Sequence, residues 1–440
     1  MLVLGLLAVL LIPAAAAGAK RTVVGELKRM EAAGAISIAD YATHRSDYDA
    51  AKTTLRKLTG ERRRELGAVI GILDDFAARG LMTTGRLPQL FLTLDRNRQW
   101  WTTSPLLSYA QRVTFSGSRL VWEFFPGQGL QLHPLANFSK VNALLSGGFD
   151  DGAKALLAEL QPFAVPRAGG IAWEYDFTFD GGQPPWVSGI ATGTAVQALA
   201  RAAKKFADPS YLDTARQALG IFKTPPPDGI RVRTPAGAHY LIYSFSHVRV
   251  LNAFVQAVNG LYDLWQTGGV PEAEPLYRDG LAEAKAEVPS FNTGAWSLYQ
   301  AGEESPLNYH TLLRDFLNGL CQRSGVQLFC TTATDFTQDL RQAPVLKVLS
   351  TKARQGKTTT LAFRLSKVST VGITLLRNGQ PALSTSASFG YGVRRITWTP
   401  RHSGTYSVKL FARDLAGNVG RAEGTVVVSK PPARHHHASH

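Results

Sequence analysis

Hydrophobic residues in the first third of the chain recur with helical periodicity. From about Thr22 to Gly80, apolar positions such as Leu27 and Met30 return every three or four residues among charged ones, which is typical of amphipathic helices. Residues 112–125 instead alternate between polar and apolar positions around a Ser-Gly-Ser turn, which indicates strands. The pattern predicts an N-terminal helical region over residues 20–110 and a β segment over residues 111–132.

Helical periodicity returns in the central part of the chain, residues 133–340. Joints rich in proline and glycine, such as residues 181–185 and 224–229, interrupt it, and new helical stretches begin near Gly193 and Val250. Antiparallel helix pairs with short connections are the building units of α/α repeat folds. We therefore predict an (α/α) toroid or incomplete barrel for this part.

After about Gln342 the pattern changes to short alternating segments separated by turn residues, as at residues 371–378 and 404–414. About seven such strands in roughly ninety residues indicate a β-sandwich. Tyr406 lies where the tyrosine-corner residue of an immunoglobulin-like domain would lie. The predicted fold class is mainly α, with a C-terminal all-β immunoglobulin-like sandwich over residues 341–430.

The two ends of the chain have distinctive compositions. Residues 1–19 contain an apolar stretch followed by Pro13 and an alanine-rich site, which is typical of a signal peptide and predicts a secreted or cell-envelope protein. A basic segment before Leu2 is missing, so a true start upstream and an uncleaved anchor are the two alternatives. Residues 431–440 form a histidine-rich tail that we expect to be disordered.

The chain is strongly basic, with 48 Lys and Arg against 33 Asp and Glu, a net charge of +15. Such a surplus favours a polyanionic partner, either an acidic polysaccharide, nucleic acid or an anionic cell surface. A genome rich in G and C would also yield an arginine-rich chain, and the total charge does not separate these explanations.

The chain has two cysteines, Cys321 and Cys330. In an exported protein, two thiols this close in sequence indicate a disulfide that closes a short loop. A redox or metal pair would call for CxxC spacing or neighbouring histidines, which this segment lacks.

Three central stretches concentrate Tyr, His, Arg and Asn near the ends of predicted elements. They are residues 239–249, 292–299 and 308–313. A phenol of pKa near ~10 acts as a base only with cationic or hydrogen-bonding help, so tyrosine beside histidine or arginine suits proton transfer. Tyrosines that merely cover a core with an amphipathic ring are the alternative interpretation.

Five segments resemble D-glucuronyl C5-epimerases, in the order in which that family has them, between about residues 120 and 320. They are Phe125–Gln131 with Phe138–Leu144, Pro185–Gly193, Val250–Phe254 with Gly260–Leu264, Asn292–Tyr299 and Tyr309–Thr311. The resemblance suggests a bacterial member of the family with a fused immunoglobulin-like domain. It implies a toroid that inverts C5 of glucuronate in a heparosan-like chain, giving iduronate, with neither a metal nor a cofactor.

The resemblance places Tyr243, Tyr299 and Tyr309 on the family's active-site tyrosines. The C5 hydrogen lies next to a carboxylate, so its removal needs a base on one face, an acid on the other, and donors for the developing enediolate. We predict that Tyr243 and Tyr309 form the opposed acid/base pair and that Tyr299 binds or shuttles.

Further residues are expected to bind substrate. Trp186 and Asn252 would line the sugar subsites or pack helices, His310 would orient substrate or pack, and Arg249 or Arg314 would supply a cation. The chain departs from the vertebrate pattern at Ile242, where an acidic residue precedes the tyrosine.

Two other functions remain open. A polysaccharide lyase would abstract the same C5 proton and then eliminate across C4, and a non-catalytic protein would bind acidic glycan or cell wall. In every case the expected partner is an acidic polysaccharide, not nucleic acid, with cell-surface association as an extension. The native polymer and the oligomeric state are left open, a dimer being one option.

Overall fold

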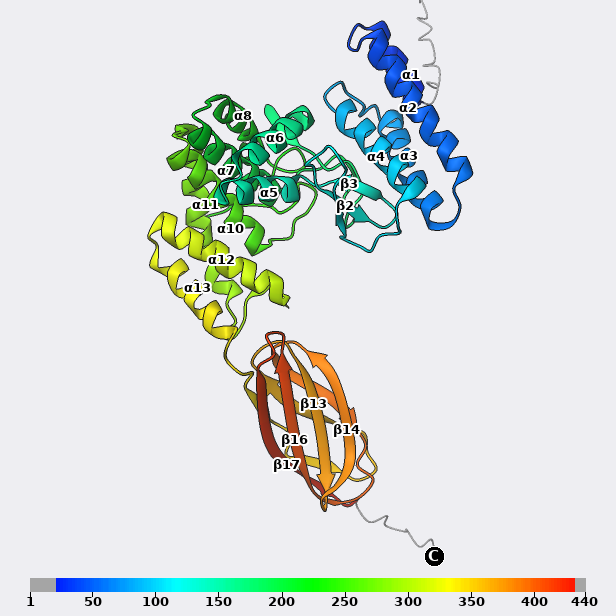
Figure 1. Cartoon of the computed structure of the whole chain (residues 1–440). Coiled ribbons are helices and arrows are strands. Elements are labelled where there is room, and N and C mark those ends of the chain that lie inside the picture. The colour runs from blue at the N-terminus through cyan, green and yellow to red at the C-terminus, as the bar shows by residue number, and fades with distance from the viewer. Residues whose placement is uncertain (1–20, 432–440) are drawn as a thin grey trace, which may run out of the picture. The chain divides into compact units, whose positions relative to one another are not determined.

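The computed structural model describes residues 21–431 (Figure 1). The predicted signal peptide and residues 432–440 of the predicted tail lie outside the described residues. The chain divides into two compact units, of which the first comprises the chain up to His133 together with residues 159–163 and 175–179. Within residues 21–431, no helix combines the length and the apolar character that a bilayer crossing requires.

Four helices make up most of the first unit: α1 (Val23–Ala32), α2 (Ile38–Lys57), α3 (Gly60–Ala78) and α4 (Leu87–Thr103). The Thr22 side chain caps α1, and Ser37 and Asp40 form a capping box at α2. These contacts satisfy backbone N–H groups that have no partner within a helix. Leu66 and Trp101 are fully buried in the core between the helices.

A small antiparallel sheet completes this unit, with strands β1 (Arg112–Val113), β2 (Trp122–Phe125) and β3 (Gly129–Leu132) in that order. The buried carboxylate of Glu65 accepts hydrogen bonds from the backbone N–H groups of Gly127 and Gly129, at 2.7 and 3.2 Å. A Cβ atom at Gly129 would lie 2.5 Å from Oδ1 of Asn97, so this tight turn requires glycine.

The second unit contains a helical part, residues 134–339, built from helix pairs. The pairs are α5 (Pro134–Ser146) with α6 (Asp150–Leu160), α7 (Gly189–Phe206) with α8 (Ser210–Ala218), α10 (Leu251–Tyr262) with α11 (Glu274–Glu287), and α12 (Leu307–Ser324) with α13 (Gln327–Asp339); the short α9 is Gly220–Lys223. We call α5, α7, α10 and α12 the leading helices (Figure 1).

A β-hairpin precedes each of the last three leading helices in the chain. The hairpins are β4 (Ala164–Arg167) with β5 (Gly170–Trp173), β6 (Arg231–Arg233) with β7 (Ala238–Tyr240), and β8 (Leu298–Gln300) with β9 (Glu303–Glu304). The repeated order of hairpin and helix pair is the organisation expected of an incomplete (α/α) toroid.

The leading helices run parallel to one another, as their contacts show. Between α5 and α7, Asn142 bonds to the carbonyl oxygen of Thr194 at 3.3 Å, and further along both helices Lys205 bonds to the carbonyl oxygen of Leu145 at 3.0 Å. Between α10 and α12, Asn259 bonds to the carbonyl oxygen of Phe316 at 3.0 Å. Parallel helices have all their N-termini at one end.

Glycines bring α7 and α10 into close contact. A Cβ atom at Gly260 would lie 2.0 Å from the carbonyl oxygen of Gly193, and one at Gly193 would lie 2.6 Å from Cα of Ala257. The two backbones therefore touch at a point where no side chain fits between them.

Near the C-terminal ends, the leading helices are joined by Asp263, which is buried. One carboxylate oxygen accepts from Gln197 at 2.9 Å and from Arg201 at 3.0 Å, and Arg323 donates to both oxygens at 2.7 and 2.9 Å. A buried charge is tolerated only when it is paired and hydrogen-bonded, and here α7 and α12 supply every partner of a residue that caps the C-terminus of α10.

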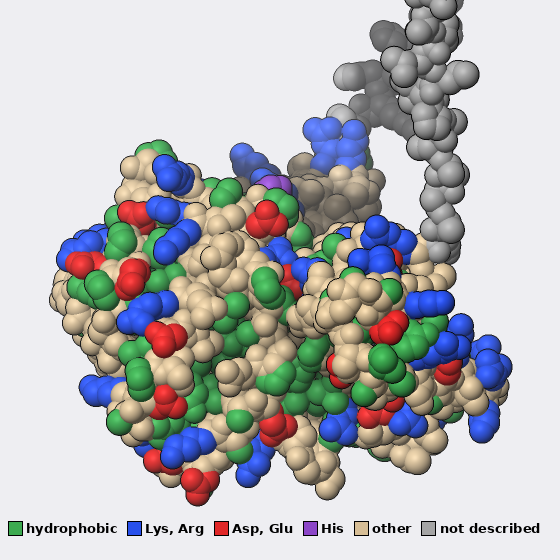
Figure 2. Space-filling view, turned by 90° about the horizontal axis from the view of Figure 1, so that it is seen from above, with side chains coloured by type: hydrophobic (Ala, Val, Ile, Leu, Met, Phe, Trp, Pro, Cys, Tyr) green, Lys and Arg blue, Asp and Glu red, His purple; other side chains and the backbone are tan. Residues whose placement is uncertain are grey.

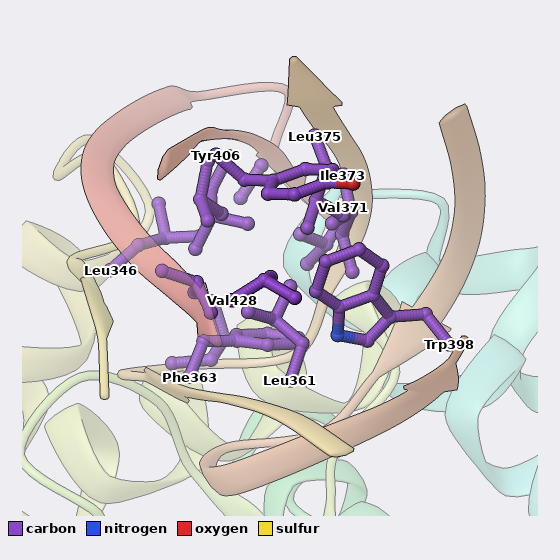
Figure 3. Close-up of a cluster of buried hydrophobic side chains, with 14 residues drawn as sticks. Leu346, Leu361, Phe363, Val371, Ile373, Leu375, Trp398, Tyr406 and Val428 are labelled. Carbon is purple, nitrogen blue, oxygen red and sulfur yellow. The ribbon is translucent and has the colours of Figure 1, made fainter. Parts of the chain in front are cut away.

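The β part, residues 341–430, contains two sheets. One has the order β10 (Leu346–Val348), β12 (Thr359–Leu365) and β15 (Gly392–Trp398); the other has the order β11 (Lys352–Arg354), β17 (Val419–Ser429), β16 (Gly404–Asp414), β13 (Ser369–Arg377) and β14 (Gln380–Phe389). Side chains from both sheets form one buried cluster that includes Phe363, Ile373, Trp398 and Val428 (Figure 3). The prediction of a mainly helical chain with a C-terminal all-β part is confirmed.

Two details of the β part bear on the sequence analysis. The hydroxyl of Tyr406 donates to the carbonyl oxygen of His402 at 2.8 Å, which is the bond expected of a tyrosine corner. Strand β14 has a serine-rich, mostly exposed sequence that lacks the alternation of a half-buried strand, so periodicity alone does not predict it.

The predicted disulfide between Cys321 and Cys330 is present, with Cα atoms 5.0 Å apart. It joins the end of α12 to the start of α13 across the turn that reverses the chain. The bond therefore closes the last helix pair.

Candidate functional site

Tyr243 is held beside the N-terminus of α7. The N–H of Gly189 donates to the carbonyl oxygen of Ile242 at 3.0 Å, and the N–H of Ser244 donates to that of Val187 at 2.9 Å. Ser188 forms a β-bridge with Tyr243 and caps α7 through its side chain. The chain that follows β7 is therefore fixed against the start of a leading helix on both sides of Tyr243.

Trp186 lies against Tyr243. The two rings meet edge to face with centroids 5.1 Å apart, and Phe245 stacks on Tyr243 at 5.3 Å. Only 3% of Trp186 is exposed, so this indole chiefly positions the phenol and offers little surface to a sugar.

Tyr299 and Tyr309 form a second aromatic pair, with centroids 5.1 Å apart. Tyr299 belongs to β8, and Tyr309 lies in the first turn of α12, where 37% of the residue is exposed. Burial, followed by the neighbouring Tyr309, raises the pKa of Tyr299 to about 12. Tyr299 is therefore a protonated hydrogen-bond donor near neutral pH.

One small apolar cluster connects the two aromatic groups. Its buried members are Ile190, Ile242, Val250 and Ala253, and Leu135, Tyr243, Tyr299 and Phe316 pack against it. All four leading helices contribute to this set. Tyr243 and Tyr299 thus share one cluster, and Tyr299 contacts Tyr309. We call Tyr243, Tyr299 and Tyr309 the tyrosine site.

The tyrosine site lies where the leading helices begin. The N-cap residues of α10 and α12 are Val250 and Pro306, whose side chains make no cap hydrogen bond. Helix N-termini carry partial positive charge and free N–H groups. This end of the helical part is therefore suited to a carboxylate or to charge that develops on one.

His310 is fully buried behind the tyrosine site. Its ring stacks on Trp296 with centroids 3.8 Å apart, Nδ1 bonds to the hydroxyl of Ser297 at 2.8 Å, and Nε2 bonds to the carbonyl oxygen of Phe336 at 3.0 Å. Burial lowers the pKa of His310 to about 4. His310 therefore supports the turn before Tyr299 and the helix that carries Tyr309, and it has no exposed atom to offer a substrate.

The predicted cation Arg249 is already paired. Its guanidinium donates to Glu283 at 3.1 Å and also to Glu287. Burial raises the pKa of Glu283; for Glu287 the opposing bonds to His239 and Arg249 outweigh burial, and its pKa is lowered. These two glutamates of α11 were missed by the sequence analysis, although their spacing of four residues places them on one helix face.

Asn252 and Arg314 also have structural partners. Asn252 is buried in the first turn of α10, and its side chain accepts from the N–H of Ala253 at 2.8 Å. Arg314 bonds to Asp315 and lines a cavity of about 170 Å³ between α12 and α13. The tyrosines do not line that cavity, so Arg314 is not brought to the tyrosine site there.

Among residues 21–431, no three His, Cys, Asp or Glu side chains are grouped as a metal site would require. The polar groups near the tyrosine site include phenols and helix N–H groups, and the carboxylates of Glu303 and Asp180 lie close enough to Tyr299 to help raise its pKa. The phenols and the helix N–H groups can move protons and bind anions.

Residues 169–338 match the model of the family described as D-glucuronyl C5-epimerase C-terminus. A D-glucuronyl C5-epimerase of Caenorhabditis elegans is 33% identical over 130 residues, 26% of this chain and 21% of that protein. An uncharacterized protein of Methanocaldococcus jannaschii is 27% identical over 168 residues, 36% of this chain and 54% of that one. The chain thus spans about a fifth and about half of these two relatives.

Solved structures show more distant likeness. A sugar epimerase from a ruminal bacterium is 15% identical with a TM-score of 0.37, covering 48% of this chain and 59% of that one. Fibronectin(III)-like modules of Clostridium thermocellum CbhA are 15% identical with a TM-score of 0.16, covering 20% and 98%. Such low scores assign neither fold nor activity.

Proposed function

Since residues 169–338 belong to the D-glucuronyl C5-epimerase C-terminal family, we propose that this chain is a carbohydrate epimerase that interconverts glucuronate and iduronate within an acidic polysaccharide. The observation that supports the proposal most is the convergence of the three predicted tyrosines at the start of parallel leading helices. Four of the five segments that carry the resemblance lie in the helical part. Pro185–Gly193, Val250–Phe254 and Tyr309–Thr311 lie at helix starts, whereas Gly260–Leu264 lies at the C-terminal end of α10.

The proposed reaction uses Tyr243 and Tyr309 from opposite faces of the sugar. One tyrosine, as phenolate, takes the C5 proton, and the electron pair moves into the carboxylate to give an enediolate. The other tyrosine donates its proton to C5 from the opposite face and becomes the phenolate. The pair is then set for the reverse direction, and exchange of the phenolic protons with solvent resets it for the next forward turnover.

Helix N-termini and Tyr299 would stabilise the enediolate. Charge develops on the carboxylate oxygens, and preorganised donors placed there lower the barrier most. Tyr299, with a pKa of about 12, keeps its proton and can donate a hydrogen bond. Ile242 is buried in the apolar cluster and cannot take the proton of Tyr243 as a carboxylate would, so phenolate formation relies on the helix starts.

The test is hydrogen exchange at C5. Heparosan and other glucuronate polymers, incubated with the protein in deuterated water, should gain deuterium at C5 without chain shortening, as read by NMR. Tyr243→Phe and Tyr309→Phe should each lower the exchange rate about 100-fold or more, since a positioned acid or base contributes on the order of 10²–10⁴. Tyr211→Phe, on α8, is the matched control and should keep the wild-type rate.

Other outcomes select other functions. Full exchange in both variants would remove the two proposed proton carriers. Products that absorb in the ultraviolet would identify a lyase, because elimination leaves an unsaturated sugar. Binding of the polymers without any exchange would identify a glycan-binding protein.

Two further proposals concern the setting of the enzyme. The disulfide between Cys321 and Cys330 supports export, because such bonds persist in oxidising compartments. The bond of Tyr406 to His402 supports an immunoglobulin-like assignment of the β part.

A further inference from the structure

Nearly all of the net charge of this chain lies in the β part. Residues 341–430 contain 15 Lys and Arg but only 2 Asp and Glu, whereas residues 1–340 contain 32 and 31. On the face drawn in Figure 2, basic and acidic side chains alternate over the helices. A compositional bias toward arginine would affect the whole chain, so it does not explain why residues 134–339 have more acidic than basic residues while the β part has almost no acidic ones.

The charges of the β part are mostly uncompensated. Asp414 is buried against Lys367 at 2.7 Å, which leaves Glu423 as the one exposed acid of residues 341–430, 3.9 Å from Lys409. Twelve of the Lys and Arg residues are exposed there. A folded surface with both signs interspersed would lower this self-repulsion, so the imbalance points to a ligand that supplies the negative charge.

The outer face of the three-stranded sheet concentrates these cations. Lys347 of β10 is the register partner of Arg364 of β12, and Arg395 of β15 is the partner of Ala362, two residues along from Arg364. Partners across an antiparallel pair lie about 5 Å apart and diagonal neighbours about 7–8 Å. We call Lys347, Arg364 and Arg395 the basic face.

Like charges placed directly opposite each other destabilise a sheet. All three residues of the basic face are exposed, and within residues 21–431 none of them forms a salt bridge or side-chain hydrogen bond. On the five-stranded sheet, by contrast, Lys409 lies near Glu423, and Arg421 lies over the ring of Phe411 at 5.3 Å. Lys352, Arg354 and Arg413 of the five-stranded sheet are also exposed, but their register partners there are uncharged. The basic face is instead a cluster to which three neighbouring strands each contribute a cation.

We propose that the basic face is a docking site for the acidic polysaccharide, separate from the tyrosine site. This inference rests on the proposed function for the identity of the polymer. The helical part contains 15 Lys and Arg against 20 Asp and Glu, so it offers no long-range attraction for a polyanion. A basic module on the same chain holds the polymer and raises its effective concentration at the tyrosine site.

The chemistry of the face favours a polysaccharide over other polyanions. Proteins that bind single-stranded nucleic acid stack bases on several aromatic side chains, and the outward positions of β10, β12 and β15 carry none within the described residues. Membrane-surface segments pair basic residues with a large apolar surface, and here Val393 is the exposed apolar residue beside Arg364. An extended chain with regularly spaced carboxylates fits three cations on neighbouring strands of a sheet.

The test compares three variants of the full chain. The first replaces Lys347, Arg364 and Arg395 with Gln; the second is a control of equal charge change, Lys28→Gln with Arg56→Gln and Lys57→Gln, at exposed positions of the first unit; the third keeps the charge as Lys347→Arg with Arg364→Lys and Arg395→Lys. Binding to heparosan is measured at 50 and 200 mM salt, and circular dichroism checks that each variant is folded.

We expect the first variant to bind heparosan about tenfold or more weakly at 50 mM salt. Without the three cations, binding displaces fewer counterions from the polymer, and the release of counterions favours binding. The control should bind within about twofold of wild type, and the charge-preserving variant should bind like wild type. Equal weakening in the first variant and the control would overturn the proposal, since only total charge would matter. Tighter binding to duplex DNA or to phosphatidylserine vesicles than to heparosan would also overturn it.

The same variants separate this proposal from the epimerase itself. If wild-type protein shows no C5 exchange but the binding pattern holds, the docking face stands and the epimerase fails. If exchange occurs and the first variant binds and exchanges like wild type, the epimerase stands and the docking face fails. If both proposals hold, the first variant should exchange C5 hydrogen more slowly than wild type on the long polymer at low concentration. On a short oligosaccharide it should keep the wild-type exchange rate.

Discussion

The two ends of the leading helices differ in how their polar side chains are paired. Near the C-terminal ends, Asp263 binds Gln197, Arg201 and Arg323, so its carboxylate is fully satisfied by the protein. At the N-terminal ends the helices meet around an apolar cluster, and tyrosines pack on it. At the C-terminal ends the polar groups bind one another, whereas the N-terminal ends present phenols and helix N–H groups.

This difference shows how contacts at one end of the helices can fix the positions of side chains at the other end. An ionic junction at one end fixes the spacing of α7, α10 and α12, and the contact between Gly193 and Gly260 fixes the approach of two backbones. At the N-terminal end of α7, backbone bonds and the Ser188 cap hold the segment that carries Tyr243. The side chains that would do chemistry are thus carried on a fixed backbone, as preorganised sites require.

Removal of Asp263 should have the largest effect on stability. Asp263→Ala leaves Arg201 and Arg323 partly buried without their anion, and breaking a buried ion pair from one side costs about 3–5 kcal/mol. Chemical denaturation should show this loss in the free energy of unfolding. Asp213→Ala is the control, because Asp213 forms an exposed pair with Arg216 and should cost about 1 kcal/mol or less. Equal losses in the two variants would show that the junction does not hold the helices.

Much of this arrangement could be predicted from the sequence, because the signals are local. Helical periodicity, the alternation of most strands in the β part, and the close spacing of Cys321 and Cys330 each depend on neighbouring residues. The parallel course of the leading helices depends instead on contacts such as that between Asn259 and Phe316, far apart in sequence. Periodicity gives the faces of a helix but not its neighbours.

Partner choice among charged residues could not be predicted either. Arg249 was expected at the substrate, yet Glu283 and Glu287 bind it from α11. His310 was expected to orient substrate or pack, and its burial between Trp296 and Phe336 decides for packing. A sequence lists the cations and anions of a chain, whereas their pairing depends on the tertiary fold.

Protonation of His310 at acid pH should lower the stability of the folded protein. The pKa of this ring is about 4 in the folded protein against an ordinary 6.5, so protonation favours the unfolded chain. Stability should be full above about pH 6.5 and fall as the pH drops toward 4, by about 1–3 kcal/mol from this residue. The measurement is the free energy of unfolding against pH for wild type and His310→Gln.

The variant should show a shallower acid decline than wild type, whatever its stability at neutral pH. The comparison of slopes matters because burial also lowers the pKa of His133, in the first unit, to about 4, and that residue contributes equally to both proteins. Identical slopes would mean that His310 is not held neutral by the fold.

The smallest effect on stability should come from Tyr299→Phe, which tests the N-terminal end directly. The ring contacts of Tyr299 with Tyr309 and the apolar cluster remain in phenylalanine, so the free energy of unfolding should change by about 0.5 kcal/mol or less. The lost hydroxyl is the proposed donor to the enediolate, and one such donor is worth about 10²–10³ in rate. C5 exchange should therefore fall by that factor while the unfolding curve stays in place. A large loss of stability with a matching loss of exchange would make Tyr299 a structural residue, and the contrast between the two ends of the leading helices would no longer hold.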